Sequence, residues 1–421
     1  MFQLARGVEA THPRAEVPSS LQERAAALAP AELRVAYFYE NPDNSTFRYR
    51  VQNMIATINS ATSDTGLAAA YFTGGEIDQL AQLAGSVDLL VICRARMSRQ
   101  LARLVARMRA RGVPLLYDVD DLVFDPGLAP LLMDTLGVDR DSEEVVNYWF
   151  SYCARIGAAL QLCDGALVTG EALGRELARA TGIPYKVLPN YLNSDQLAAS
   201  EVIWAQKVAG DFQSSGWHLG YFSGSPSHNR DFARVSPALR CLLESDPQLG
   251  VRVVGHLDPG PALQGFGPRV ELLPLQGTVE LQWLIGEVNV CLAPLQLNRF
   301  TDCKSDLKWF EAAVAGTVVV ASPAGGVGRR IRDGVNGRIA RSYEWFDTLR
   351  ELALDPGDYR RLAEAARAEA LSECTPESQL PRIVAVLEAA ARGGWRQAPD
   401  PAPVSAGAGG AISPDEAAPP E

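Results

Sequence analysis

The sequence predicts an α/β protein made of two doubly wound, Rossmann-like domains that face a cleft. Short runs of β-branched and aliphatic residues alternate with longer amphipathic stretches, and the alternation begins again in the second half of the chain. With 421 residues, the chain is too long for one typical domain and suits two or three. Because ligands of open α/β sheets bind beyond the carboxyl ends of the strands, the loops that follow the strands should face the cleft.

The expected strands are short, and several lack polar alternation, as strands do when helices cover both faces of their sheet. Those of the first half are residues 34–39, 67–72, 87–93, 114–118, 166–169 and 186–188, and those of the second half are residues 218–222, 251–255, 270–273, 290–294 and 317–321. The stretches expected to form helices are residues 76–84, 98–111, 143–162, 171–180, 231–244, 279–287, 305–315, 344–353, 359–372 and 376–391.

Five segments follow from this order of elements. We expect an N-terminal extension at 1–30, a first Rossmann-like domain at 31–212, a second at 213–375, a C-terminal helix packed back towards the first domain at 376–395, and a disordered tail at 396–421. The change between the domains falls in the Gly- and Ser-bearing stretch 210–217. The tail is predicted to be disordered because it is acidic and rich in Pro, Ala and Gly.

Composition and charge exclude several classes of protein. The chain has 39 basic and 50 acidic residues, a formal charge of −11, so we expect no nucleic-acid partner. Its seven cysteines and four histidines form no CxxC, HExxH or mixed cluster, so neither a disulfide framework nor a zinc site is predicted. The first residues lack the apolar core of a signal peptide, and no apolar run reaches the length of a membrane span. A reduced, cytoplasmic protein is therefore expected.

The most informative stretch is VNVCLAPLQLNRFTDCKSDLKWFEAAVAG at 288–316, where a strand leads through a polar loop to a helix expected near Ser305. Lys304, Lys308 and Glu311 are spaced i, i+4 and i+7, so they share one face of that helix. The free N–H groups and positive potential of a helix N-terminus suit a pyrophosphate. Two lysines add charge, and a carboxylate accepts ribose hydroxyls. The alternative is an exposed helix with an ordinary Lys–Glu pair.

This stretch resembles the donor motif of retaining GT-B glycosyltransferases, a family-4-like group, in bacterial members that read DxKSxLKxxEAxxxG. The matching residues are Asp302, Lys304, Ser305, Leu307, Lys308, Glu311, Ala312 and Gly316. The larger family has two glutamates eight positions apart here, and Cys303 stands in place of the first. The resemblance implies the GT-B fold and a UDP-, GDP- or dTDP-sugar donor, with no cofactor or metal ion required. It implies that Glu311 binds the donor ribose and that Lys304 and Ser305 supply polar contacts.

Two further segments resemble parts of the same family that touch the donor phosphates. The segment GYFSGSPSHNRDF at 220–232 follows a strand, and its candidate donor-binding residues are Gly224, Ser225, His228 and Arg230. The Gly-rich SPAGGVG at 322–328 lets the backbone approach phosphate closely, which makes Gly325 and Gly326 candidates as well. The alternative for His228 is a loop side chain that bonds to a neighbouring backbone group.

The first domain carries the candidate acceptor residues by the same resemblance. Asn44, Arg48 and Arg50 lie in the polar loop NPDNSTFRYR that follows the first strand. The segment YDVDDLVFD follows the fourth strand, and we predict that Asp118, Asp120 and Asp121, together with Lys304, are catalytic. Such carboxylates bind acceptor hydroxyls or stabilise an oxocarbenium-like charge. The alternatives are aspartates that cap loops, or a metal-binding DxD of a single-domain (GT-A) transferase, which leaves the duplicated pattern unexplained.

These observations predict a glycosyltransferase that moves a sugar from a nucleotide sugar to a hydroxyl of a glycan, lipid-linked or protein acceptor, with retention. Other functions of the same fold stay open: a sugar epimerase or phosphorylase, or a non-catalytic partner subunit, which Cys303 favours. Peripheral contact with the inner membrane surface is a further possibility, because Arg96, Arg99, Arg103 and Arg107 line one face of a predicted helix. A solvated arginine face is its alternative, and the sequence does not indicate an oligomeric state.

Overall fold

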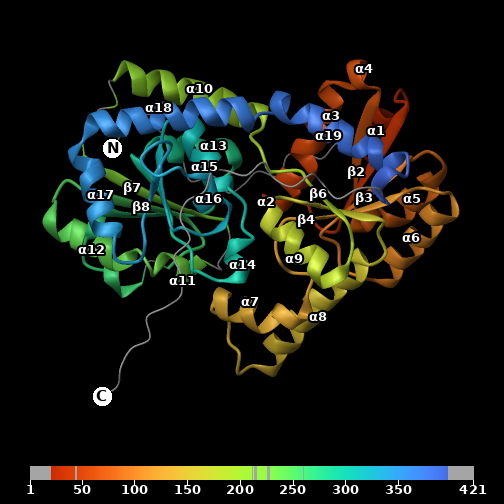
Figure 1. The fold of residues 1–421 in the computed structure, drawn as a ribbon, viewed down its shortest axis with the longest axis horizontal. Helices are drawn as coiled ribbons and strands as arrows, with labels where there is room; N and C mark the ends of the chain where they lie inside the picture. The colour runs from red at the N-terminus through yellow and green to blue at the C-terminus, as the bar shows by residue number, and fades with distance from the viewer. Residues whose placement is uncertain are drawn as a thin grey trace, which may run out of the picture.

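The computed structural model describes residues 20–42, 45–210, 212, 216–224, 228–258 and 260–396. Within these ranges the chain forms two parallel, six-stranded sheets, one in each half of the molecule (Figure 1). The predicted disordered tail lies outside the described residues except for its first residue, 396. Most of the predicted N-terminal extension also lies outside them, and its described part contains helix α1 (Leu21–Leu28).

The first sheet has the strand order β2-β1-β3-β4-β5-β6. Its strands are β1 (Leu33–Tyr39), β2 (Leu67–Thr73), β3 (Leu89–Cys93), β4 (Leu115–Val119), β5 (Gly165–Val168) and β6 (Tyr185–Val187). All five residues of β3 are buried, as the uninterrupted apolar run predicts. The strand order reverses between β1 and β3, and ligands of doubly wound sheets bind at such a switch point.

Helices cover both faces of the first sheet. They are α2 (Ser45–Phe47), a π-helical turn η1 (Arg48–Gln52), α3 (Asn53–Ser60), α4 (Thr62–Thr65), α5 (Ile77–Gln82), α6 (Arg99–Ala110), α7 (Ala129–Leu136), α8 (Glu143–Leu160) and α9 (Glu171–Thr181). Helices α5, α6, α8 and α9 share one apolar core with the sheet. Ser98 caps α6 by accepting the Leu101 N–H at 3.1 Å, and the predicted apolar side of this helix is buried.

The second sheet repeats this plan with the order β12-β11-β10-β7-β8-β9, and it reverses between β7 and β10. Its strands are β7 (His218–Ser223), β8 (Gly250–Gly255), β9 (Val270–Leu273), β10 (Val290–Ala293), β11 (Val318–Ala321) and β12 (Arg338–Ile339). Its helices are α10 (Ser194–Ala209), α11 (Asn229–Phe232), α12 (Ser236–Ser245), α13 (Thr278–Gly286), α14 (Arg299–Asp302), α15 (Leu307–Val314), α16 (Gly325–Arg330), α17 (Trp345–Leu354) and α18 (Pro356–Glu373). The eleven predicted strands are confirmed, and the two-residue β12 is the strand that the pattern missed.

The change between domains comes earlier than the predicted stretch 210–217. Helix α10 packs against α13 and α15 of the second domain, although it lies inside the predicted first domain. Ile203 belongs to the second-domain core, and the buried Lys207 donates to the Gly316 carbonyl at 3.0 Å. The boundary was misplaced because a local Gly/Ser stretch shows where the chain turns, whereas packing decides which domain a helix joins.

The last two helices run from one domain to the other across the top of the view in Figure 1. Helix α18 packs on α15 of the second domain, and α19 (Pro376–Ala391) packs on α3 of the first. Ile383, Leu387 and Ala390 of α19 join the core on the α3 side of the first sheet. No helix in the described part of the chain is long and apolar enough to cross a membrane.

Candidate functional site

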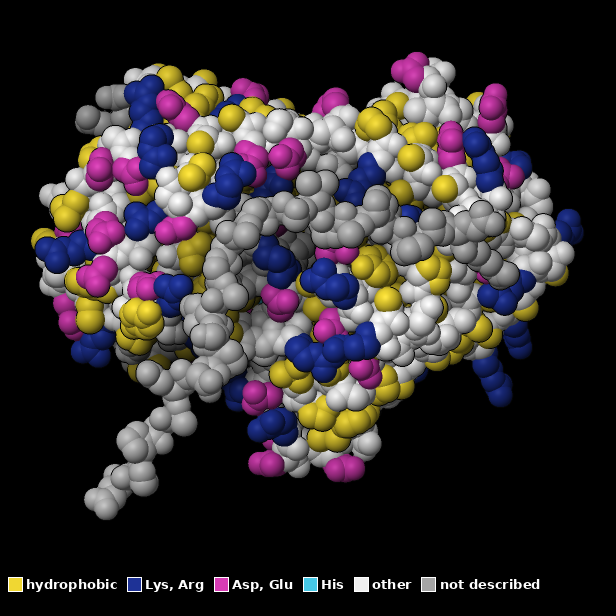
Figure 2. All heavy atoms as spheres, viewed as in Figure 1, with side chains coloured by type: hydrophobic (Ala, Val, Ile, Leu, Met, Phe, Trp, Pro, Cys, Tyr) yellow, Lys and Arg dark blue, Asp and Glu magenta, His cyan; other side chains and the backbone are white. Residues whose placement is uncertain are grey.

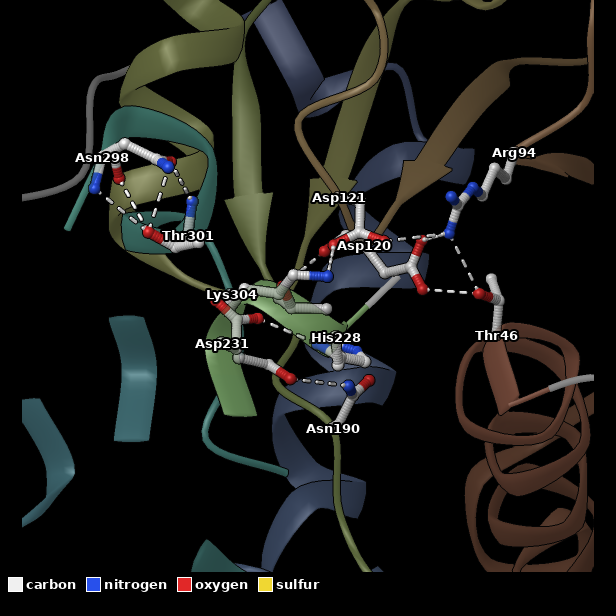
Figure 3. Close-up of polar contacts among 12 residues, drawn as sticks. Thr46, Arg94, Asp120, Asp121, Asn190, His228, Asp231, Asn298, Thr301 and Lys304 are labelled. Atoms are coloured by element: carbon white, nitrogen blue, oxygen red, sulfur yellow. Dashed lines mark hydrogen bonds and ion pairs between the residues drawn. The ribbon is translucent and has the colours of Figure 1, made fainter. Parts of the chain in front are cut away.

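The loops that follow the switch-point strands of both sheets converge between the two domains. The first domain contributes residues that follow β1, β3 and β4, and the second contributes residues that follow β7 and β10 (Figure 3). This is the edge at which parallel strands present their carboxyl ends, where ligands of this architecture bind. The side chains that meet here are mainly charged or hydrogen-bonding.

Two adjacent carboxylates after β4 form the first-domain side of the site. Asp120 accepts a hydrogen bond from the Thr46 hydroxyl at 2.7 Å. Arg94 Nη1 lies 2.9 Å from Asp120 Oδ1 and 3.3 Å from Asp121 Oδ2, so one guanidinium holds both carboxylates (Figure 3). Arg94 has a φ of 47°, a left-handed conformation that costs a non-glycine residue about 1–3 kcal/mol. Such strain is typical of functional positions, and Arg94 is a residue that the sequence reasoning missed.

Lys304 reaches from the second domain to this pair of carboxylates. Its Nζ lies 3.2 Å from Asp121 Oδ1 and 4.7 Å from the centre of the Phe300 ring (Figure 3). Burial acts to raise the pKa of Asp121, but Lys304 and Arg94 outweigh it and hold this pKa at about 2. Asp121 therefore stays ionised at neutral pH, which suits an acceptor of hydrogen bonds better than a general base.

More positive charge lies behind Lys304, around the end of β7. Lys308 Nζ donates to the Phe222 carbonyl and lies 4.9 Å from the centre of the Tyr221 ring. His228 Nδ1 lies 3.0 Å from Asp231 Oδ2, a side-chain carboxylate and not the backbone group that its alternative interpretation expected. Burial lowers the pKa of both Lys308 and His228, and the charge of Lys304 acts in the same direction on each. At neutral pH the lowered pKa leaves His228 uncharged, so an anion here would relieve the repulsion between Lys304 and Lys308.

Glu311 is buried and contacts the first domain. The Tyr49 hydroxyl donates to Glu311 Oε1, and Gln196 Nε2 donates to that hydroxyl at 2.9 Å. Burial raises the pKa of Glu311, although Tyr49, Lys308 and Arg48 act in the opposite direction. Arg48 itself is half-buried beside this group. Tyr49 is a second residue that the sequence reasoning missed, because its contact with Glu311 joins positions 262 residues apart.

Arg50 and Asp118 do not line the site as predicted. Arg50 Nε and Nη2 each lie 2.8 Å from an oxygen of Asp118, and the two side chains are 0% and 1% exposed. Arg50 also donates to the Leu188 carbonyl at 2.7 Å and to Asn190 Oδ1 at 3.1 Å. The geometry indicates a structural ion pair rather than acceptor binding or catalysis, because no face of either group is open to a ligand. Asn190 Nδ2 in turn lies 3.4 Å from Ser305 Oγ, which links the pair to the donor motif.

Arg230 is also placed differently from the prediction. Its guanidinium lies 2.9 Å from Asp134 on α7 of the first domain, so it bridges the domains instead of facing the Lys304 group. On the same helix α7, Thr135 Oγ1 accepts from Asn298 Nδ2 at 3.0 Å, and its carbonyl accepts from Gln296 Nε2 at the same distance. Asn44 and Ser225 lie outside the described residues.

Cys303 is buried with the first-domain core, at 4% exposure, instead of facing Lys304. Ser305 and Lys304 precede α15, which begins at Leu307 and not at the predicted Ser305. Part of the predicted Gly-rich loop at 322–328 is helical, because α16 begins at Gly325. A Cβ on Gly224 would meet no atom of the described residues within 4 Å, so packing against them does not require the glycine there.

Gly325 and Gly326 let α16 lie directly on the backbone around Lys304. A Cβ on Gly326 would come within 2.7 Å of Asp306 N, a contact that real structures do not show. We expect Gly326→Ala to displace the segment that carries Lys304 and to destabilise the protein by about 1–3 kcal/mol. Thermal unfolding with and without nucleotide measures both effects, and Gly75→Ala, whose Cβ would meet one atom at 4.0 Å, is the matched control. An unchanged melting temperature in Gly326→Ala would contradict this packing.

The DxD interpretation gains no support from the described residues. Among them, no group of three or more His, Cys, Asp or Glu side chains is arranged to hold a metal ion. Asp120 and Asp121 instead face Arg94 and Lys304.

Comparison with known proteins finds glycosyltransferases among the proteins that this chain resembles. Residues 237–385 match the model of a family described as glycosyl transferase-like. The D-inositol 3-phosphate glycosyltransferase of Actinosynnema mirum is 32% identical over 144 residues, which are 30% of this chain and 33% of that protein. The match thus spans about a third of the length of this curated relative.

Solved structures match over most of the chain. Anabaena Alr3699/HepE, in a complex with UDP and glucose, has a TM-score of 0.57 at 15% identity, and the match covers 85% of this chain and 100% of that one. A glycosyltransferase from Rickettsia africae has a TM-score of 0.58 at 11% identity and covers 85% and 98%. The predicted GT-B fold of two Rossmann-like domains is therefore confirmed, and the glycosyl transferase-like match lies within its second half.

Proposed function

We propose that this protein is a glycosyltransferase that moves a sugar from a nucleoside-diphosphate sugar to a hydroxyl of a glycan, lipid-linked or protein acceptor. The observation that carries the proposal is the position of Lys304. It extends from the second domain to Asp121 of the first, with Lys308 and His228 close behind it. A diphosphate bound here would meet positive charge from one domain while carboxylates of the other domain face the reacting sugar.

In the reaction, the bond between the anomeric carbon and the diphosphate oxygen breaks, and the diphosphate leaves with the electron pair. Lys304 and Lys308 stabilise the charge that develops on that oxygen, which is an effect of fixed charges in a site shielded from water. The acceptor hydroxyl oxygen forms the new bond to the anomeric carbon, and its proton passes to the departing diphosphate oxygen. Asp120 and Asp121 accept hydrogen bonds from that hydroxyl and stabilise the positive charge on the sugar.

The remaining donor residues are assigned from the donor motif and from their positions. Glu311 accepts the ribose hydroxyls beside Tyr49, and Ser305 supplies a polar contact near Lys304. Retention of configuration rests on the resemblance to retaining GT-B enzymes. UDP is the first nucleotide to test because HepE, one of the structural neighbours, was solved with UDP; GDP and dTDP are the alternatives. No cofactor is part of this proposal.

A thermal-shift experiment with UDP, GDP, dTDP and the corresponding monophosphates tests the donor site. We expect one diphosphate at about 100 times its Kd to stabilise the folded protein by about 2.7 kcal/mol, and its monophosphate to stabilise it less. The same diphosphate should give little shift in Lys304→Ala. If no nucleotide raises the melting temperature, or if Lys304→Ala keeps the full shift, the donor site is wrong.

Peripheral contact of the cytoplasmic protein with an anionic membrane is part of the same proposal. Arg99, Arg103 and Arg107 are exposed on α6 of the first domain, the side that would receive a lipid-linked acceptor.

A further inference from the structure

An aromatic cluster on α8 lies next to the carboxylates of the proposed site. Tyr148 and Tyr152, one helical turn apart, have nearly parallel rings, with centres 5.9 Å apart and planes inclined by 18°. Trp149 meets both rings edge-on, at 5.5 and 5.7 Å. Tyr148 is 53% exposed, although an apolar ring is usually placed away from water. Hydrophobic side chains also gather in Figure 2 at the lower centre, where Figure 1 draws α7 and α8.

Arg94 connects the cluster to the site. Arg94 Nε donates to the Tyr152 hydroxyl at 3.2 Å, and the same guanidinium holds Asp120 and Asp121. Arg96, two residues further along, lies within electrostatic reach of Tyr148 and Tyr152. Glu40 pairs with Arg96 at 2.8 Å, so charged hydrogen-bonding groups lie beside the rings.

We propose that Tyr148, Trp149 and Tyr152 form the platform on which a sugar ring of the acceptor stacks, with Arg96 and Glu40 as partners for its hydroxyls. This rests on the proposed glycosyltransferase function and assigns its acceptor to the carbohydrate class. A pyranose has an apolar face of C–H groups and a rim of hydroxyls. Flat aromatic rings beside paired charges match that combination, and tyrosine offers such a surface at a small entropic cost.

A sugar ring is a better occupant than a lipid surface for two reasons. The rings border an ion pair and the two catalytic carboxylates, whereas a lipid-facing patch extends over apolar residues away from buried charge. Tyr152 uses its hydroxyl within the site, which fixes the platform relative to the place where the acceptor hydroxyl must react.

Saturation-transfer NMR on the full chain tests the platform directly. The probes are methyl α- and β-pyranosides of glucose, galactose, mannose and N-acetylglucosamine, each measured with and without UDP. We expect transfer to the ring protons of at least one glycoside, and an approximately tenfold weaker affinity in Tyr148→Ala. Tyr148→Phe keeps the ring and should keep binding. Phe150→Ala is the matched control, because Phe150 is 40% exposed on the same helix but outside the cluster.

Each outcome decides the question. The platform is wrong if no glycoside binds the wild-type protein, or if Tyr148→Ala binds as tightly as Phe150→Ala. It is also wrong if the aromatic variants lose sedimentation with phosphatidylglycerol vesicles while glycoside binding is unaffected, because that result assigns the rings to a membrane. The UDP-induced thermal shift separates the two proposals. If UDP still raises the melting temperature of Tyr148→Ala, the donor site is intact whether or not the platform binds a glycoside. If UDP does not raise the melting temperature of the wild-type protein, only the donor site is refuted.

Discussion

Replacing Lys304 with alanine is expected to lower kcat by about 100- to 1000-fold, the usual cost of removing one group that stabilises developing negative charge. Lys304 is a cation that reaches across the domains to the proposed catalytic carboxylates, at 3.2 Å from Asp121, and it precedes the helix that carries Lys308 and Glu311. When the donor binds, the ammonium group of Lys304 can leave Asp121 and pair with the diphosphate instead. Release of the nucleoside diphosphate, measured with the donor identified by thermal shift, gives kcat and KM.

The control for this variant is Arg240→Ala, which removes the same charge from an exposed position on α12. It should change neither kcat nor the shift produced by the nucleotide. Lys304→Ala should fold normally, because Asp121 keeps Arg94 as a partner at 3.3 Å. Equal kcat values for Lys304→Ala and the wild type would remove the main support for the proposed mechanism.

Arg50→Ala is expected to destabilise the protein by about 3–5 kcal/mol, because it leaves a buried carboxylate without its partner. Asp118 is 1% exposed and loses the two hydrogen bonds that Arg50 donates, and the Leu188 carbonyl loses a donor as well. Burial raises the pKa of Asp118 even with Arg50 present. Without Arg50, its folded-state pKa should lie further above the unfolded value, so the loss of stability should shrink as the pH falls. Urea denaturation followed by circular dichroism measures the change.

Two further variants separate the cost of leaving a buried carboxylate unpaired from the cost of removing an arginine. Arg240→Ala removes an arginine from the exposed pair with Glu244 and should leave the denaturation midpoint nearly unchanged. The double variant Arg50→Met with Asp118→Leu replaces the pair by apolar groups and should recover most of the lost stability. If Arg50→Ala is no less stable than Arg240→Ala, the pair is not the structural element that its burial indicates.

By itself, the sequence determined the architecture and the chemical character of the site. Strands such as β3 could be predicted because an apolar run of that length must be buried on both faces, and this is a local property. The charged stretch that reaches the first domain could be picked out because Lys304, Lys308 and Glu311 lie within eight residues of one another, and its donor role stays a prediction. Because the Rossmann-like pattern occurs twice, the sequence also predicted that the loops after the strands face the cleft between the domains.

Only the tertiary structure decided which charged residues are available to bind a ligand and which are paired in the core. Arg50 and Asp118 carry the same kinds of groups as Arg48 and Asp121, but the chain pairs the first two in the core across 68 residues of sequence. Arg94, Tyr49 and the α8 aromatics carry no local signal, because their roles depend on partners from distant elements. Side-chain type and spacing therefore predict where charge is available, whereas burial and long-range pairing determine which charges meet a ligand.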